Sequence, residues 1–309
     1  MSDIKLFSLQ AGQVTELASK SALLEKHLQE QIEQHMEVFL GVRFLATEYS
    51  TGKTHKGRID SLGLDENGCP VIVEYKRHSN ENVINQGLFY LDWLLDHQAE
   101  FKWLVMEKLG KDAADDIEWG GTRLICIASD FNRYDEHAVQ QINRNIELMR
   151  YRYFGSDLLL LELVNAQTAS GPIITELDVD ADVPEKKQTK DKSQRERLSE
   201  ASSELLALYN SLCQFTEQLG DEVQRKELKH YTAFKRIRNF AAFIVMPGKK
   251  DPRIQVYLKL PGTRAQNDDF SRDVSNIGHW GSGDLELTVR SAEDVEKAKG
   301  LIQECYLGS

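Results

Sequence analysis

The sequence predicts an α/β fold with a mixed central sheet flanked by helices, followed by a smaller α+β domain. Three observations support this prediction. The chain has 309 residues, whereas a single domain usually has roughly 100–200, so two domains are expected. Its 41% of hydrophobic residues is enough for packed cores and excludes wholesale disorder. Strand-like and helix-like segments alternate through the first half of the chain, which is typical of α/β domains.

The first domain is expected over residues 1–165, and its first elements follow from apolar spacing. Apolar residues recur about every four positions between Ser21 and Gly41, which indicates an amphipathic helix with Ser21 as its N-cap and Gly41 as its stop. Residues 65–68 form a strong turn signal between two alternating segments, which indicates a β-hairpin. The elements expected here are strands at Ile4–Leu9 and Arg43–Thr51, the helix between them, and the hairpin at residues 57–77.

The rest of the first domain is expected to complete the sheet. Residues 80–109 have helical periodicity, so they predict one or two helices. The largely apolar run Thr122–Ala128 is typical of a buried strand. The remaining elements expected are a helix at Glu136–Ile146 and strands at Glu147–Tyr153 and Leu158–Val164.

A change in composition at residues 166–197 indicates a charged linker. This stretch has few large apolar residues and carries an acidic block followed by a basic one, which disfavours a packed core. Residues 198–309 are then expected to form a basic α+β domain. Its expected elements are helices at Leu198–Leu219 and Ala292–Tyr306 and strands at Tyr231–Met246, Arg253–Leu260 and Leu285–Val289.

Several function classes are excluded by the sequence. The longest apolar runs, Leu158–Leu161 and Phe240–Met246, are far shorter than the ~18 residues that cross a bilayer, so no membrane partner is expected. The N-terminus has no secretory signal pattern, and the four cysteines form no CxxC pair. We therefore expect reduced thiols and a cytoplasmic location. No P-loop or HExxH motif is present, which excludes the common ATP-motor and zinc-protease signatures.

Positive charge is concentrated in one part of an acidic chain. The formal net charge is −11, yet residues 225–264 contain eleven cations and only two acids, which gives +9. A localised basic segment is typical of a surface that binds phosphates, and a solvated charged face is the alternative interpretation. The candidate nucleic-acid-binding residues are Arg58, Arg77, Lys235, Arg236, Arg238, Lys249 and Lys250.

Two carboxylates and a lysine lie close together on the expected hairpin. Period-2 alternation places Glu74 and Lys76 on one face of their strand, and hairpin pairing brings Asp60 beside them. Converging carboxylates suit Mg²⁺ or Mn²⁺, and a nearby ammonium suits a role in orienting water or stabilising phosphoryl charge. The alternative is an ordinary cross-strand ion pair on the surface.

Four motifs in this order resemble the PD-(D/E)xK nuclease superfamily. They are Glu25-Lys-His-Leu28, Gly-Arg-Ile-Asp60, Val-Glu74-Tyr-Lys76-Arg and Gln86-Gly-Leu-Phe-Tyr90. The likeness covers about residues 20–165 and looks closest to the NucS/RecB-like branch, with Ile59-Asp60 in place of Pro-Asp. The second domain resembles a small C-terminal domain of unknown function found on such nuclease-like proteins. The resemblance implies a restriction-endonuclease-like fold for the first domain.

The resemblance also implies catalytic roles. Asp60 and Glu74 would bind Mg²⁺ or Mn²⁺ with the Tyr75 carbonyl, and Lys76 would position or activate the hydrolytic water. Gln86 and Tyr90 would hold the scissile phosphate or buttress the site. The helix carboxylate would act at a second metal or through water; Glu25 fits the motif, while Glu33 and Glu48 remain alternatives.

The implied activity is metal-dependent hydrolysis of phosphodiester bonds by a DNA endonuclease. A homodimer is plausible because two sites cut two strands most easily. The main alternative is a catalytically silent nuclease fold that serves as a nucleic-acid-binding or protein-assembly module. A third is an adaptor whose basic segment meets an acidic protein partner.

Overall fold

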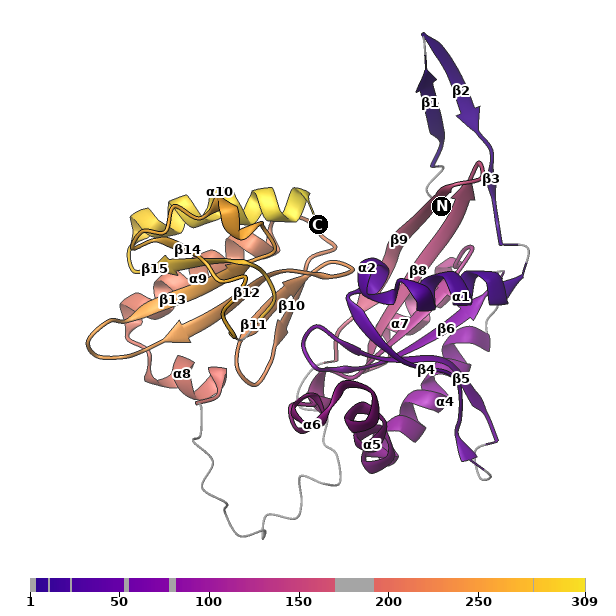
Figure 1. Ribbon diagram of the computed structural model, residues 1–309, viewed down its shortest axis with the longest axis horizontal. Helices are drawn as coiled ribbons and strands as arrows, with labels where there is room; N and C mark the ends of the chain where they lie inside the picture. The colour runs from indigo at the N-terminus through magenta and orange to yellow at the C-terminus, as the bar shows by residue number, and fades with distance from the viewer. Residues whose placement is uncertain are drawn as a thin grey trace. The chain divides into compact units, whose positions relative to one another are not determined.

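The computed structural model describes residues 4–10, 12–22, 24–52, 56–77, 82–169, 192–279 and 281–308. The chain divides into two compact units (Figure 1). The first comprises residues 1–64 and 70–173, and the second comprises residues 65–69 and 174–309. No described helix is long and apolar enough to cross a membrane.

The first unit is built on a mixed sheet, which confirms the predicted fold class. Within the described residues the strand order is β3-β8-β7-β6-β5-β4, with β9 also paired to β8. Strands β6, β7 and β8 are parallel to one another, whereas β3, β5 and β9 run antiparallel to their neighbours. The strands are β3 (Ser19–Lys20), β4 (Val42–Ser50), β5 (Arg58–Asp65), β6 (Pro70–Lys76), β7 (Arg123–Ala128), β8 (Asn145–Phe154) and β9 (Leu158–Gln167).

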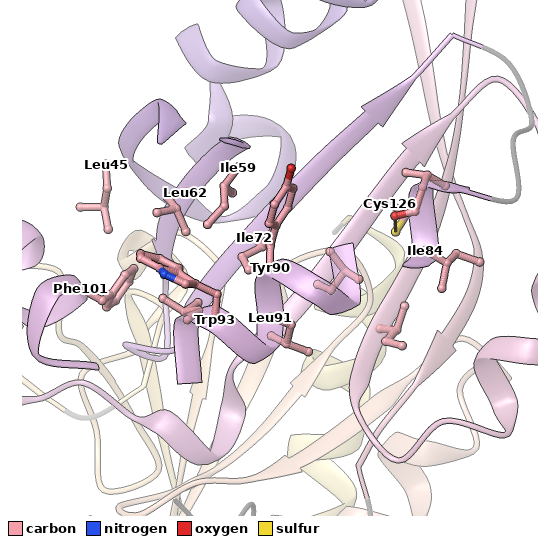
Figure 2. Close-up of a cluster of buried hydrophobic side chains, with 14 of the residues drawn as sticks. Leu45, Ile59, Leu62, Ile72, Ile84, Tyr90, Leu91, Trp93, Phe101 and Cys126 are labelled. Carbon is pink, nitrogen blue, oxygen red and sulfur yellow. Dashed lines mark hydrogen bonds between the residues drawn. The ribbon is translucent and has the colours of Figure 1, made fainter. Parts of the chain in front are cut away.

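Helices connect the parallel strands and cover the sheet. Helices α4, α5 and α6 lie between β6 and β7, and α7 lies between β7 and β8, as parallel connections require. Buried residues of α4 and α5 pack with Ile72 and Leu124 in one core cluster (Figure 2). The alternate β6 residues Val71, Val73 and Tyr75 are buried as well, so both sheet faces are covered. The helices are α1 (Glu25–Gln34), α2 (Met36–Leu40), α4 (Asn82–Asp96), α5 (Gln98–Leu109), α6 (Lys111–Asp115) and α7 (Arg133–Gln140).

Two helix predictions in this unit were wrong in detail. The helix expected from Ser21 begins at Glu25, after an N-cap Leu24 that makes no side-chain cap, and it breaks at His35 before α2 starts. Gly41 does end α2, with a φ of 64° in the left-handed region that glycine adopts readily. The helix expected at Glu136–Ile146 is instead α7, which starts earlier at an Asn132 capping box.

The end of that predicted helix belongs to the sheet. Asn145 and Ile146 begin β8 and pair with Arg123 and Leu124 of β7, because Ile146 is buried there. At the N-terminus, β1 (Leu6–Gln10) agrees with the strand expected at Ile4–Leu9. It pairs with β2 (Gln13–Leu17), which the sequence did not predict.

The second unit contains an antiparallel sheet backed by two helices. Among the described residues the strand order is β10-β11-β12-β13-β15-β14, and residues of α9 and α10 share one core cluster with the sheet. The strands are β10 (Gln224–Glu227), β11 (Thr232–Lys235), β12 (Asn239–Met246), β13 (Arg253–Leu258), β14 (Ser271–Asp273) and β15 (Leu285–Val289). The helices are α8 (Gln194–Glu200), α9 (Ser203–Glu217) and α10 (Ala292–Leu307).

The single strand expected at Tyr231–Met246 is a hairpin. Its turn is closed by the Arg236 amide donating to the Arg238 carbonyl, and the Arg-Ile-Arg sequence of this turn contains no glycine, proline or asparagine to signal it. The expected linker 166–197 is also shorter, since β9 reaches Gln167 and α8 begins at Gln194. Residues 170–191 of that linker lie outside the described residues.

Candidate functional site

The two predicted carboxylates meet where strands β5 and β6 part. The last pair of their ladder is Ser61 with Val73, so Asp60 and Glu74 come next. The Asp60 amide donates to Glu74 Oε1 at 3.1 Å, and the Tyr75 amide donates to Asp60 Oδ2 at 3.0 Å. Carboxylate oxygens therefore accept from amides that would bond to carbonyls in a regular antiparallel ladder. This reciprocal pair fixes both acids at one end of the hairpin.

Glu74 is the most deeply buried group of the site, with 0% of its surface exposed. Its second oxygen, Oε2, accepts a hydrogen bond from Gln86 Nε2 at 2.9 Å. Burial and the neighbouring Asp60 carboxylate raise the pKa of Glu74 to about 9, against the opposing effects of the Asp60 amide and Lys76. Burial also raises the pKa of Asp60. Without a cation, Glu74 therefore holds a proton at neutral pH.

Lys76 extends from the end of β6 toward the start of helix α1. Its Nζ lies 3.5 Å from Glu25 Oε2, and its side chain is 21% exposed. Glu25 also contributes to the raised pKa of Asp60. Among the described residues, the motif carboxylate Glu25 thus lies beside both Lys76 and Asp60.

The other two candidates for the helix carboxylate have different partners, and Glu48 lies on strand β4 rather than on a helix. Glu48 pairs with Arg58, Oε2 to Nε at 3.3 Å, and its charge also raises the pKa of both Asp60 and Glu74. Glu33 Oε1 accepts from the Ser61 hydroxyl at 2.6 Å, behind the two acids. Glu33 therefore supports the hairpin, while Glu25 and Glu48 contribute negative charge to the site.

Tyr90 is part of the core rather than of an open surface. It is buried within the cluster drawn in Figure 2, and its hydroxyl accepts from the Arg58 amide at 3.2 Å. A Cβ on Gly57 would lie 2.5 Å from the Tyr90 ring, so this close approach requires glycine. Of the two roles expected for Tyr90, these contacts support buttressing of β5.

Sequence reasoning missed Gln29, which braces the site from helix α1. Its Nε2 lies 2.8 Å from the Asp60 carbonyl oxygen, 3.1 Å from Thr47 Oγ1 and 3.0 Å from Glu33 Oε1. Gln29 is only 8% exposed. Glu25, Gln29 and Glu33 are spaced four apart, so they share a helix face. This spacing of polar side chains was the sequence signal from which Gln29 could have been identified.

The donor set of the site fits a hard divalent cation. Asp60 Oδ2 and both Glu74 oxygens have protein donors, and Asp60 Oδ1 accepts no hydrogen bond from a described residue. Carboxylate oxygens are the ligands that Mg²⁺ and Mn²⁺ prefer. Asp60 and Glu74 are thus the residues that could hold such an ion. The described residues contain no cluster of three or more His, Cys, Asp or Glu side chains arranged for a metal.

The basic segment of the second unit is partly neutralised by nearby acids. Arg225 pairs with Glu217 and Glu227, and Arg264 pairs with Glu304. Counting charge in a sequence window overlooks Glu217 and Glu304 because they come from other parts of the chain.

The candidate nucleic-acid-binding cations differ in their exposure. Lys235 is 2% exposed, so its assignment to a surface that contacts phosphates was wrong; it follows a register shift after Phe234 and pairs with Asn239 at the hairpin turn. Arg236 pairs with Glu222 at 3.1 Å and stacks over the Tyr306 ring. Arg238 is half-buried and makes no ion pair with a described residue. The exposed cations are Arg58, which pairs with Glu48, and Arg77, Lys249 and Lys250.

One comparison with known proteins matches part of the second unit, and another matches the whole chain. Residues 195–308 match DUF5655, a domain of unknown function. An uncharacterized protein of Haemophilus influenzae is 28% identical over 309 residues, covering 97% of this chain and 99% of that protein. The chain therefore resembles that protein along its whole length.

The structural neighbours are repair endonucleases, at low coverage and low TM-score. A repair endonuclease from Pyrococcus abyssi matches with a TM-score of 0.28 and 18% identity, over 43% of this chain and 49% of that one. A structure described as an EndoMS-dsDNA2 complex matches with a TM-score of 0.26 and 20% identity, over 42% and 47%. The chain thus spans about half the length of these solved structures.

Replacing Glu74 by glutamine should change how stability depends on pH. The pKa of Glu74 rises from 4.5 to about 9 on folding, so its stabilising effect is complete below pH 4.5 and is lost as pH rises toward 9. In EDTA, the melting temperature of Glu74→Gln relative to wild type should therefore increase between pH 5 and pH 9. The exposed Glu107→Gln is the control, and a pH-independent difference for Glu74→Gln would refute the raised pKa.

Proposed function

We propose that the chain is a metal-dependent DNA endonuclease that hydrolyses phosphodiester bonds with its first unit. The observation that carries the proposal is the reciprocal pair of hydrogen bonds that holds Asp60 and Glu74 together at the end of the hairpin, with Lys76 two residues beyond Glu74. Two hard-oxygen donors and an ammonium within one small site suit phosphoryl chemistry.

Each residue has a role that its contacts support. Asp60 and Glu74 would hold Mg²⁺ or Mn²⁺, which supplies Lewis acidity and a more acidic bound water. Gln86 orients the Glu74 carboxylate through Oε2. Lys76, partly exposed and 3.5 Å from Glu25, can hold a water molecule or a phosphate oxygen with its remaining hydrogens. Tyr90 holds the start of β5 in place through the Arg58 amide.

A second candidate function is a nuclease fold that binds nucleic acid or assembles proteins without cutting. One observation favours it: three of the four carboxylate oxygens of Asp60 and Glu74 already accept hydrogen bonds from the protein. These hydrogen bonds hold the two side chains without a cation. Metal-dependent cleavage separates the two candidates.

Cleavage should depend on divalent metal and on Glu74. Single-stranded, duplex and branched DNA are incubated with Mg²⁺, Mn²⁺ or EDTA, and products are resolved on denaturing gels. Glu74→Gln should lower the rate at least about a hundredfold, since it removes a charged metal ligand, and Lys76→Met should also lower it. Glu107→Gln, on an exposed face of α5, should cut at the wild-type rate.

The products of this assay also test whether the chain acts as a homodimer and whether it cuts DNA at all. Paired cuts in both duplex strands, with a molecular mass twice that of the chain, would support a homodimer. Binding without cutting in every metal would favour the non-catalytic module. Cleavage by Glu74→Gln at the wild-type rate would refute the site.

Gln29 should act as a positioning residue for Asp60. Gln29→Ala removes the hydrogen bond to the Asp60 carbonyl, so the maximal cleavage rate should fall by roughly ten- to a hundredfold while the KM for DNA stays the same. The control is Gln34→Ala, an exposed glutamine on the same helix. If both variants lose activity equally, or if Gln29→Ala acts only through a lower melting temperature, Gln29 has no positioning role.

The exposed lysines after β12 should contribute to DNA affinity. The double variant Lys249→Glu with Lys250→Glu should weaken DNA binding and reduce the slope of log affinity against log salt by about 1–2. Fluorescence anisotropy over a salt series measures this slope. The control is the double variant Lys108→Glu with Lys111→Glu, which makes the same change of charge at exposed positions of the first unit. If wild type and the double variant at Lys249 and Lys250 have equal slopes, the two lysines are not part of the surface that binds DNA.

A further inference from the structure

A pocket on the second unit lies outside every residue given a role so far. Its volume is about 250 Å³, and it opens on the face of the sheet that α9 and α10 leave uncovered. On β13, Ile254, Val256 and Leu258 pack in the core with those helices, whereas the alternate residues Gln255 and Tyr257 line the pocket.

One wall of the pocket is helix α8, which is anchored to the sheet. The buried side chain of Gln194 accepts from the Val245 amide at 3.2 Å and donates to the Phe243 carbonyl at 3.3 Å. The described ladder between β11 and β12 ends at the pair Thr232 with Phe243, so Gln194 takes the place of a neighbouring strand. This anchor sets the position of Arg197, one turn further along α8.

Arg197 presents a positive charge to the pocket. Its Nη1 lies 2.7 Å from the Met246 sulfur, and its Nε donates to the Lys192 carbonyl at 2.9 Å. Neither partner carries a carboxylate, and no described acid forms an ion pair with Arg197. The guanidinium is therefore available for an anionic ligand.

A second guanidinium is held at the same pocket by a buried carboxylate. Glu286, 2% exposed, accepts from Arg272 Nε at 2.7 Å and from Nη2 at 2.8 Å. Tyr257 also hydrogen-bonds to Glu286. The Arg272 side chain is nevertheless 51% exposed, so its outer edge faces solvent. Two guanidinium groups and one carboxylate leave the pocket with net positive charge, which favours an anion.

Aromatic and apolar side chains also line the pocket. The rings of Tyr257 and His279 stack with centroids 4.5 Å apart and planes 4° apart, and Ile244, Val274 and Ile277 add apolar surface. A simple phosphate would use only the arginines. A flat heterocycle that carries a phosphate would use the arginines and the stacked rings together.

We propose that this pocket binds one nucleotide, with its phosphate on Arg197 and its base against His279. The volume of about 250 Å³ lies at the small end of ligand pockets, so it limits the ligand to a single unit rather than a polymer segment of several units. The shared chemistry, a base joined to a phosphate, could come from a free mononucleotide or from an unpaired nucleotide of single-stranded DNA. Binding of an unpaired DNA nucleotide rests on the proposed function, whereas binding of a free mononucleotide does not.

Titration calorimetry of the full chain in EDTA tests the proposal independently of cleavage. The probes are deoxyadenosine 5′-monophosphate, inorganic phosphate and a ten-nucleotide single-stranded DNA. Arg197→Gln should weaken nucleotide binding roughly tenfold or more, since it removes a charged hydrogen-bond donor. Arg195→Gln makes the same change on an exposed position of the same short helix and should leave binding unchanged. His279→Ala should weaken binding of the nucleotide but not of inorganic phosphate.

The outcomes separate the two sources and can overturn the proposal. Binding of the mononucleotide identifies a free nucleotide as sufficient, whereas binding of the oligonucleotide alone identifies a DNA strand. For the strand, photo-crosslinking through 5-iododeoxyuridine should label the peptide that contains His279. The proposal is wrong if no probe binds, if Arg197→Gln binds like wild type, or if the crosslink maps only to the first unit. Because these measurements need no metal, they stand even if the chain cuts no DNA.

Discussion

The candidate site depends on one exchange of hydrogen bonds at the end of the β5–β6 hairpin. The Asp60 amide bonds to the Glu74 carboxylate, and the Tyr75 amide bonds to the Asp60 carboxylate. Two side chains are thereby held by main-chain donors of the opposite strand, which restricts their rotamers far more than contact with solvent would. The same exchange ends the regular ladder, so the two strands separate beside the acids and leave space there for a ligand.

Burial determines what kind of ligand this arrangement favours. Glu25, Glu48, Asp60 and Glu74 contribute negative charge, and Lys76 and Arg58 oppose it only in part. A buried carboxylate that lacks a cation takes up a proton instead, which is the state that the raised pKa of Glu74 describes. A divalent cation would replace this proton and satisfy both acids. Gln29 holds the Asp60 main chain through its carbonyl, and Gln86 holds the Glu74 carboxylate.

Sequence alone predicted the parts of the structure that depend on local pattern. The alternating strands on either side of residues 65–68 gave the hairpin, and its register placed Asp60 beside Glu74. The strands β7, β8 and β9 were found as segments from their apolar runs. These features repeat at short range, so periodicity is sufficient to find them.

The features that the sequence did not predict depend on residues far apart in the chain. Gln29 reaches Asp60 across 31 positions, and the polar spacing of its helix, although visible in the sequence, does not identify that partner. The Arg236–Arg238 turn has no typical turn residue, so β11 and β12 were predicted as one strand. The excess of positive charge at residues 225–264 is reduced by Glu217, Glu222 and Glu304, which approach only after folding. Charge counted along a sequence therefore overstates the charge of a surface.

A buried glutamate organises each of the two candidate sites, and its partner decides which ligand the site favours. Glu74 accepts from an amide and from the Gln86 carboxamide, which carry no charge, so its negative charge remains to be balanced by a proton or a cation. Glu286 accepts both of its arginine hydrogen bonds from Arg272, so its charge is balanced within the protein. The outer edge of Arg272 and the guanidinium of Arg197 then dominate the pocket, which favours an anion. A buried glutamate would thus serve the proposed metal ion in the first unit and the proposed phosphate in the second.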